Sequence, residues 1–110
     1  LNMLYGPGND LVSATALTAA GAHMILFSTG RGTPFGAPAP TLKIATNSQL
    51  AARKKTWIDF NAGTLVEDEE PQAVLERFIG KVLATAGGER LKHEETGFKE
   101  IAIFKTGVTL

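Results

Sequence analysis

The stretch Met24-Ile25-Leu26-Phe27-Ser28-Thr29-Gly30-Arg31-Gly32-Thr33-Pro34 decides the fold. Its first part, residues 24–28, is short, apolar and rich in β-branched and aromatic side chains, which predicts a buried strand. Its second part cannot continue that strand, because two glycines and a proline interrupt it. Arg31 stands between the glycines, and a guanidinium on such a turn suits a planar anion because its fork matches a carboxylate bidentately. A structural turn whose arginine faces water is an equal alternative.

Helices and further strands surround this stretch. The predicted elements are a helix over residues 11–20, strands over 41–46 and 57–60, a helix over 48–55, a helix over 71–86 and a last short strand over 101–104. Asn9 and Asp10 are candidate N-caps of the first helix, and Asn47 is the candidate cap of the second. The Gly-Pro-Gly turn before the first helix leaves an anion site at its N-terminus as an alternative to an ordinary cap.

The helix over 71–86 has the clearest pattern. Pro71 suits a first helical position, the acidic residues before it complement the helix dipole, and Gly87-Gly88 ends the run. Apolar residues recur at intervals of three and four, so we expect one face to pack on the sheet through Val74, Phe78, Ile79 and Val82. Residues 89–97 are charged and predicted to form a loop, in which His93 is solvated.

The order of these elements predicts a layered α/β domain over residues 1–110. A strand, a helix and a strand over 41–60 form a βαβ unit, which implies a parallel pair and a mostly parallel sheet with flanking helices. The direction of the strand over 24–28 relative to its neighbour stays open, because the proline-rich loop over 30–40 contains no helix. Loops of this length inside compact domains are often functional.

Ligands of open parallel sheets bind beyond the carboxyl ends of the strands. In this sequence those ends carry a polar and cationic set that suits a small oxygen-rich acid. The candidate substrate-binding residues are Thr29, Gly30, Arg31, Gly32, Thr33, Asn47 and Asn61.

Composition excludes several classes of function. The chain has 110 residues with eleven basic and eleven acidic side chains, so no net field favours nucleic acid or a membrane as partner. Residues 1–66 nevertheless hold five Lys/Arg against two Asp/Glu, which favours an anionic ligand on the side of the glycine-rich turn. The sequence contains no cysteine, which excludes thiolate catalysis and cysteine metal ligands within the chain and fits a cytoplasmic enzyme.

Familiar catalytic and nucleotide motifs are absent from the sequence. The glycine spacing after residue 30 and the following prolines oppose a dinucleotide fingerprint, and no Gly-Lys-Ser/Thr is present, so we expect no nucleotide cofactor. His23 and His93 stand far apart, and the serines have no evident His–Asp partners. Asp10 is the carboxylate near a glycine-rich turn, and an N-cap role is the simpler interpretation of it.

Taken together, four segments resemble the C-terminal part of the altronate/galactarate dehydratase family, with the galactarate branch favoured. They are Gly6-Pro7-Gly8-Asn9-Asp10, Leu26 to Pro34, Thr41-Leu42-Lys43-Ile44 with Thr46-Asn47, and Trp57-Ile58-Asp59-Phe60-Asn61-Ala62-Gly63. The closing Ile101-Ala102-Ile103-Phe104-Lys105 and Gly107-Val108-Thr109-Leu110 resemble the family's extreme C-terminus.

The resemblance implies a hydro-lyase that converts galactarate or altronate to a keto-deoxy sugar acid with iron(II) or manganese(II). It also implies a Rossmann-like large domain of which this chain is the last part, so the expected partners are a sugar-acid substrate and upstream domains, with scope for a homodimer. Arg31 would hold a substrate carboxylate with Thr29, Thr33 and Asn47, while the base and metal ligands are unknown and the isolated segment is expected to be inactive. The alternative is a non-catalytic α/β module that binds a small carboxylate or phosphate.

Overall fold

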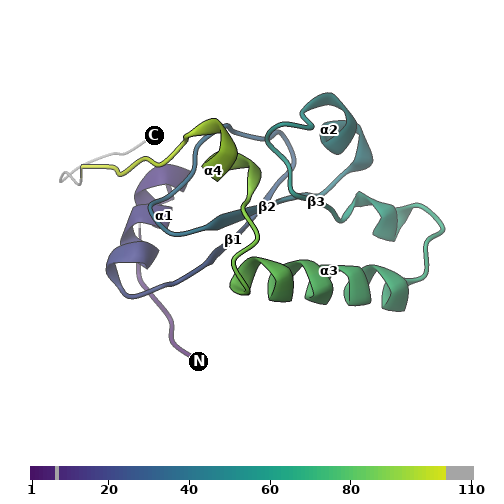
Figure 1. Ribbon diagram of the computed structural model, residues 1–110, viewed down its shortest axis with the longest axis horizontal. Helices are drawn as coiled ribbons and strands as arrows, with labels where there is room; N and C mark the ends of the chain where they lie inside the picture. The colour runs from purple at the N-terminus through teal and green to yellow at the C-terminus, as the bar shows by residue number, and fades with distance from the viewer. Residues whose placement is uncertain (7, 104–110) are drawn as a thin grey trace.

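The computed structural model describes residues 1–6 and 8–103 as a small α/β structure (Figure 1). The elements in chain order are α1 (Asp10–Ala19), β1 (Ile25–Thr29), β2 (Thr41–Ala45), α2 (Ser48–Arg53), β3 (Phe60–Asn61), the 3-10 helix η1 (Gly63–Val66), α3 (Pro71–Ala86) and α4 (Lys92–Thr96). The predicted helix over 71–86 is confirmed at both ends, and the other predicted helices and the first two strands are confirmed with ends shifted by one or two residues. Within the described ranges, no helix is long and apolar enough to cross a bilayer.

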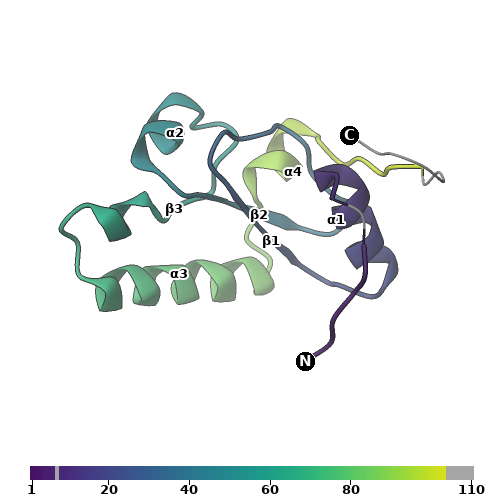
Figure 2. The ribbon, with the colours of Figure 1, turned by 180° about the vertical axis from the view of Figure 1, so that it is seen from behind.

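The sheet has three parallel strands in the order β1-β2-β3. Ile25 pairs with Thr41 and Ile44 pairs with Phe60, so β2 is the central strand. The predicted parallel sheet is therefore confirmed, and the open question about β1 is settled as parallel. In both views α2 and α4 lie above the strands and α3 lies below them (Figures 1 and 2).

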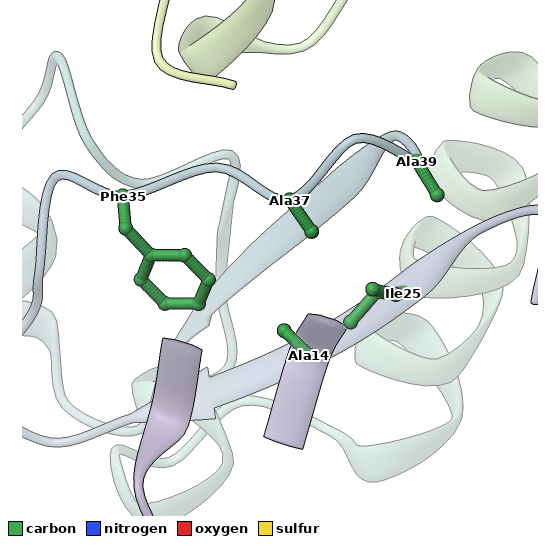
Figure 3. Packing of buried hydrophobic residues seen from close by; sticks show 5 residues of the cluster. All are labelled: Ala14, Ile25, Phe35, Ala37 and Ala39. Carbon is green, nitrogen blue, oxygen red and sulfur yellow. The ribbon is translucent and has the colours of Figure 1, made fainter. Parts of the chain in front are cut away.

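The loop over 30–40 covers the sheet where a crossover helix would usually lie. Phe35, Ala37 and Ala39 are buried against Ile25 of β1 and Ala14 of α1 (Figure 3). The Thr41 hydroxyl ties this loop down, because it accepts from the Ala37 amide at 3.1 Å and donates to the Ala39 carbonyl at 3.0 Å. This irregular segment thus closes one face of the sheet, and Thr41 satisfies two of its backbone groups.

The strand predicted over 57–60 is wrong in extent, because β3 contains only Phe60 and Asn61. The Asp59 side chain explains the difference. Its Oδ2 accepts from the Lys43 amide at 2.9 Å, where a strand would offer a backbone carbonyl, and its Oδ1 accepts from the Lys92 amide at 3.0 Å. One carboxylate therefore replaces a ladder bond and also fixes the start of α4.

The end of the described chain also differs from the prediction. Residues 92–96 form α4 rather than loop, and residues 101–103 are not a strand, while Phe104 lies outside the described residues. The prediction of a solvated His93 is wrong, since its side chain is 3% exposed. Its Nε2 accepts from the Thr41 amide at 2.9 Å, and its Nδ1 lies 2.7 Å from the Phe98 carbonyl, to which it donates. An added Cβ at Gly36 would overlap this ring, so Gly36 is needed for the close approach.

Only part of the predicted α3 face packs on the sheet. Val74 is 3% exposed, and the rings of Phe60 and Phe78 meet edge to face at 5.3 Å between centroids. Ile79, which the sequence placed on the same face, is 48% exposed. The helix therefore rests on β3 and η1 with one edge of its apolar surface.

Candidate anion-binding site

The turn after β1 is held in one conformation by its own hydrogen bonds. The Thr29 hydroxyl accepts from the amides of Arg31 at 3.3 Å and Gly32 at 2.9 Å. Gly32 has a φ of +82°, which favours glycine, and an added Cβ would also press on Leu50 of α2 at 3.0 Å. The sequence Thr-Gly-Arg-Gly thus builds a tight turn that presents Arg31 at the surface.

Residues of α2 and the segment after it lock this turn from the side. Asn47 caps α2 by accepting from the Leu50 amide at 2.7 Å, and its amide donates to the Gly30 carbonyl at 3.1 Å. The Lys54 ammonium donates to the Arg31 carbonyl at 3.1 Å and lies 4.4 Å from the centre of the Trp57 ring. The backbone that carries Arg31 is consequently fixed at two successive carbonyls.

A surface cavity of about 480 Å³ opens between this turn and α2. It is lined by Gly30, Arg31, Asn47, Gln49, Leu50, Arg53 and Lys54. Three of these residues are cations and none is an acid. The ion pairs in residues 1–6 and 8–103 involve Arg77 and Lys81, so no salt bridge there neutralises the cavity. Its geometry and charge suit a small anion with several oxygen atoms.

Lys43 lies behind the turn, and the sequence pattern alone did not single it out. It is 1% exposed, its ammonium group donates to the Thr33 carbonyl at 2.6 Å, and it lies 5.1 Å from the centre of the Phe35 ring. Burial lowers the pKa of Lys43 to about 8, although Asp59 and Glu100 act to raise it. A lysine between Leu42 and Ile44 in the middle of the central strand is the signal that could have identified it.

The structure brings most, but not all, of the predicted site residues together. Residues 29–32 and Asn47 meet at the carboxyl ends of β1 and β2, as predicted for parallel strands. Thr33 lies farther along, where its carbonyl accepts from Lys43. Asn61 does not line the cavity, because its amide donates to the Ser48 hydroxyl at 3.0 Å and its Oδ1 accepts from the Gly63 amide at 2.8 Å.

The candidate carboxylate Asp10 has another place in the structure. The cap of α1 is Asn9, whose Oδ1 accepts from the Val12 amide at 3.1 Å, whereas Asp10 is the first helical residue. In residues 1–6 and 8–103, no three His, Cys, Asp or Glu side chains gather closely enough to hold a metal ion. These residues therefore do not fit a metal centre of their own.

Comparison with known proteins finds one family that matches nearly the whole chain. The profile of the family described as "D-galactarate/Altronate dehydratase, C-terminal" matches residues 1–109. The chain is 56% identical over 110 residues to an altronate dehydratase of Escherichia coli K12 and 53% identical over 111 residues to one of Bacillus subtilis 168, in each case over all of this chain and 22% of the relative. It is 45% identical over 65 residues, 58% of this chain and 12% of the relative, to a galactarate dehydratase (L-threo-forming) of Escherichia coli K12.

The identities to the altronate dehydratases are higher and extend along the whole chain, so they do not support the galactarate preference drawn from the sequence. The chain spans about a fifth of the length of these altronate dehydratases. The family match itself covers all but the last residue of the chain. The chain therefore belongs to the galactarate/altronate dehydratase family and corresponds to its C-terminal part.

Proposed function

We propose that this chain is the C-terminal part of a sugar-acid hydro-lyase, and that its basic cavity holds a carboxylate of the substrate. The match of the family profile to residues 1–109 carries the proposal. The relatives that match along the whole chain are altronate dehydratases, which makes altronate the first substrate to test and galactarate the second.

The charge of the cavity suits the chemistry of dehydration beside a carboxylate. That reaction removes a proton from the carbon next to the carboxylate and releases hydroxide from the following carbon. Loss of the proton places additional negative charge on the carboxylate oxygens, which nearby cations stabilise more strongly than they stabilise the substrate. Arg31, Arg53 and Lys54 line the cavity from two elements and are placed to do this.

The rigidity of the turn supports the same role. The Arg31 carbonyl is bound by Lys54 and the Gly30 carbonyl by Asn47, so the backbone under the guanidinium is held before any ligand binds. A fixed backbone limits how far the guanidinium has to be reoriented as charge develops. The bidentate geometry of arginine also fixes the direction of the bound carboxylate, which a lysine cannot do.

The cavity lacks the remaining parts of an active site. Its lining contains no carboxylate and no imidazole, so it offers neither of the usual general bases. We propose that the base and the ligands of an iron(II) or manganese(II) ion belong to the part of the full-length enzyme that this chain does not cover. We further propose the Rossmann-like arrangement of the large domain as the setting for these groups.

The test is Arg31→Lys in the full-length enzyme. We expect kcat/KM for altronate to fall about 100-fold, because lysine keeps the positive charge but cannot reproduce the bidentate geometry. Arg77→Lys is the matched control, because Arg77 lies on α3 in an ion pair with Glu69 and outside the cavity. Near-normal turnover of the Arg31 variant removes Arg31 from the site. Anion binding without turnover in the unmutated full-length protein favours the non-catalytic module instead.

A further inference from the structure

Helix α3 carries an apolar surface that the described structure only half covers. Val74 is buried, whereas Leu75 is 47%, Ile79 48% and Leu83 66% exposed. Successive residues of a helix are separated by 100°, so these three exposed side chains form one stripe beside the buried Val74–Phe78 edge. A helix face that is exposed to water usually carries polar side chains at such positions. Here they are all aliphatic.

The stripe continues into an apolar groove of about 400 Å³ between α3 and the end of the sheet. Every residue that lines the groove is apolar: Ile44, Phe60, Ala62, Leu65, Pro71, Val74, Leu75 and Phe78. Leu65 is 48% exposed at its edge. The groove and the stripe share Leu75, so they form one continuous surface, which we call the α3 surface.

The basic groups of α3 are paired within the chain. Arg77 pairs with Glu69, and Lys81 pairs with Glu89 at 2.8 Å. These two pairs give both basic groups of α3 a partner within the chain, while Leu75, Ile79 and Leu83 are left without a covering layer in the described structure. An exposed apolar surface of this kind marks an interaction site.

We infer that the α3 surface is the docking site for the upstream part of the same polypeptide in the full-length enzyme. The altronate dehydratases that match all of this chain are about four to five times as long, so most of the folded enzyme lies outside these residues. Residues 1–5 lead away from the body on the same lower side as α3 in both views (Figures 1 and 2).

A second copy of the chain is the competing occupant, and the apolar character alone does not separate the two. The covalent connection favours the upstream part of the same polypeptide, because a tethered segment is present at a high effective concentration at any total protein concentration. The inference rests on the family match and not on the proposed reaction. The activity of the enzyme and the location of this contact are therefore tested separately.

The experiment places a photoreactive benzoylphenylalanine at position 79 of the full-length protein. Position 80 is the matched control, because Gly80 is exposed, an added Cβ there meets nothing within 4 Å, and it points 100° away around α3. We expect irradiation to join residue 79 to peptides that precede residue 1 within one polypeptide, and this product to be lost at position 80. Mass spectrometry of a mixture of ¹⁴N- and ¹⁵N-labelled protein distinguishes links within one copy from links between copies.

Three outcomes overturn the inference: mixed-isotope links, which assign the surface to a second copy; equal labelling from positions 79 and 80; and no protein cross-link from position 79. The photoprobe at position 79 is expected to leave the fold unchanged, because Ile79 is already half exposed and its replacement leaves the buried edge at Val74 and Phe78 intact. The far-ultraviolet circular dichroism of both photoprobe variants is expected to match that of the unmodified enzyme.

Discussion

Three single side chains hold the backbone of the turn at the candidate site. Lys43 reaches the Thr33 carbonyl from the central strand, while Asn47 and Lys54 hold the carbonyls of Gly30 and Arg31. Each of these residues binds backbone oxygen, so the shape of the turn does not depend on a bound ligand. Burial of Lys43 lowers the stability of the folded state, because its ammonium group is removed from water.

This cost predicts a dependence of stability on pH. Below about pH 8 Lys43 is charged in both the folded and unfolded states, and the full penalty of burial is present. As pH rises from about 8 towards 10.5, the folded state loses this proton while the unfolded state still holds it, so stability increases with pH. The gain from this residue reaches about 3 kcal/mol at most.

Lys43→Met provides the comparison. Urea unfolding of both proteins between pH 7 and pH 10 gives the difference in free energy of unfolding, in which contributions from the other titrating groups cancel. We expect the unmodified protein to gain stability relative to Lys43→Met across this interval. A difference that stays constant from pH 7 to pH 10 contradicts the lowered pKa of Lys43.

At the scale of elements, α3 is attached by a narrow contact. Val74 and the Phe78–Phe60 ring pair hold it to the end of the sheet, and the adjacent Leu75, Ile79 and Leu83 are exposed. The helix has a clear apolar pattern along its whole length, yet the sheet at this end consists of the two residues of β3 and cannot cover the helix. This mismatch between a long helix and a short strand is why the α3 surface exists.

The narrow contact predicts an intermediate loss of stability on truncation of Phe78. A fully buried phenylalanine costs about 3–5 kcal/mol on replacement by alanine, and a surface residue about 0.5 kcal/mol or less. Phe78 is partly buried, so we expect Phe78→Ala to cost about 2 kcal/mol in urea unfolding of the 110-residue protein. Leu83→Ala is the control on the exposed stripe, and equal losses in the two variants contradict the packing of α3 through its Val74–Phe78 edge.

At the scale of the whole molecule, the described residues supply the basic cavity that we propose for a carboxylate, and that cavity is lined by no carboxylate or imidazole. The cavity supplies three cations, and the described residues contain no cluster that could hold a metal. A hydro-lyase also needs a base and stabilisation of the leaving hydroxide. These functions are expected from the remaining four-fifths of the full-length relatives.

We therefore expect the isolated 110-residue chain not to dehydrate altronate or galactarate. The assay uses purified, reduced protein supplied with iron(II) or manganese(II), and follows formation of the keto-deoxy acid. The full-length enzyme under the same conditions is the control. Metal-dependent turnover by the isolated chain on the order of 1 s⁻¹ or more, an ordinary enzymatic rate, means that the site is complete within these residues.

The sequence by itself determined the elements that local patterns define. Helix α3 follows from Pro71, the apolar spacing and Gly87, and the turn after β1 follows from its glycines, because both depend on neighbours in the chain. The placement of Arg31 beside Asn47 was also predictable, since parallel strands end at one edge. The family was recognisable from the turn after β1 together with residues 6–10, 41–47 and 57–63, and not from α3.

Only the tertiary structure decided which side chains are removed from water. Lys43 and His93 are polar residues, and both are buried because partners 5 to 52 positions away satisfy their polar atoms. Asp59 shortened the last strand by bonding to backbone 16 and 33 residues distant. Ile79 fits a core pattern yet stays exposed, because periodicity shows that a face is apolar and not how much of it the neighbouring element can cover.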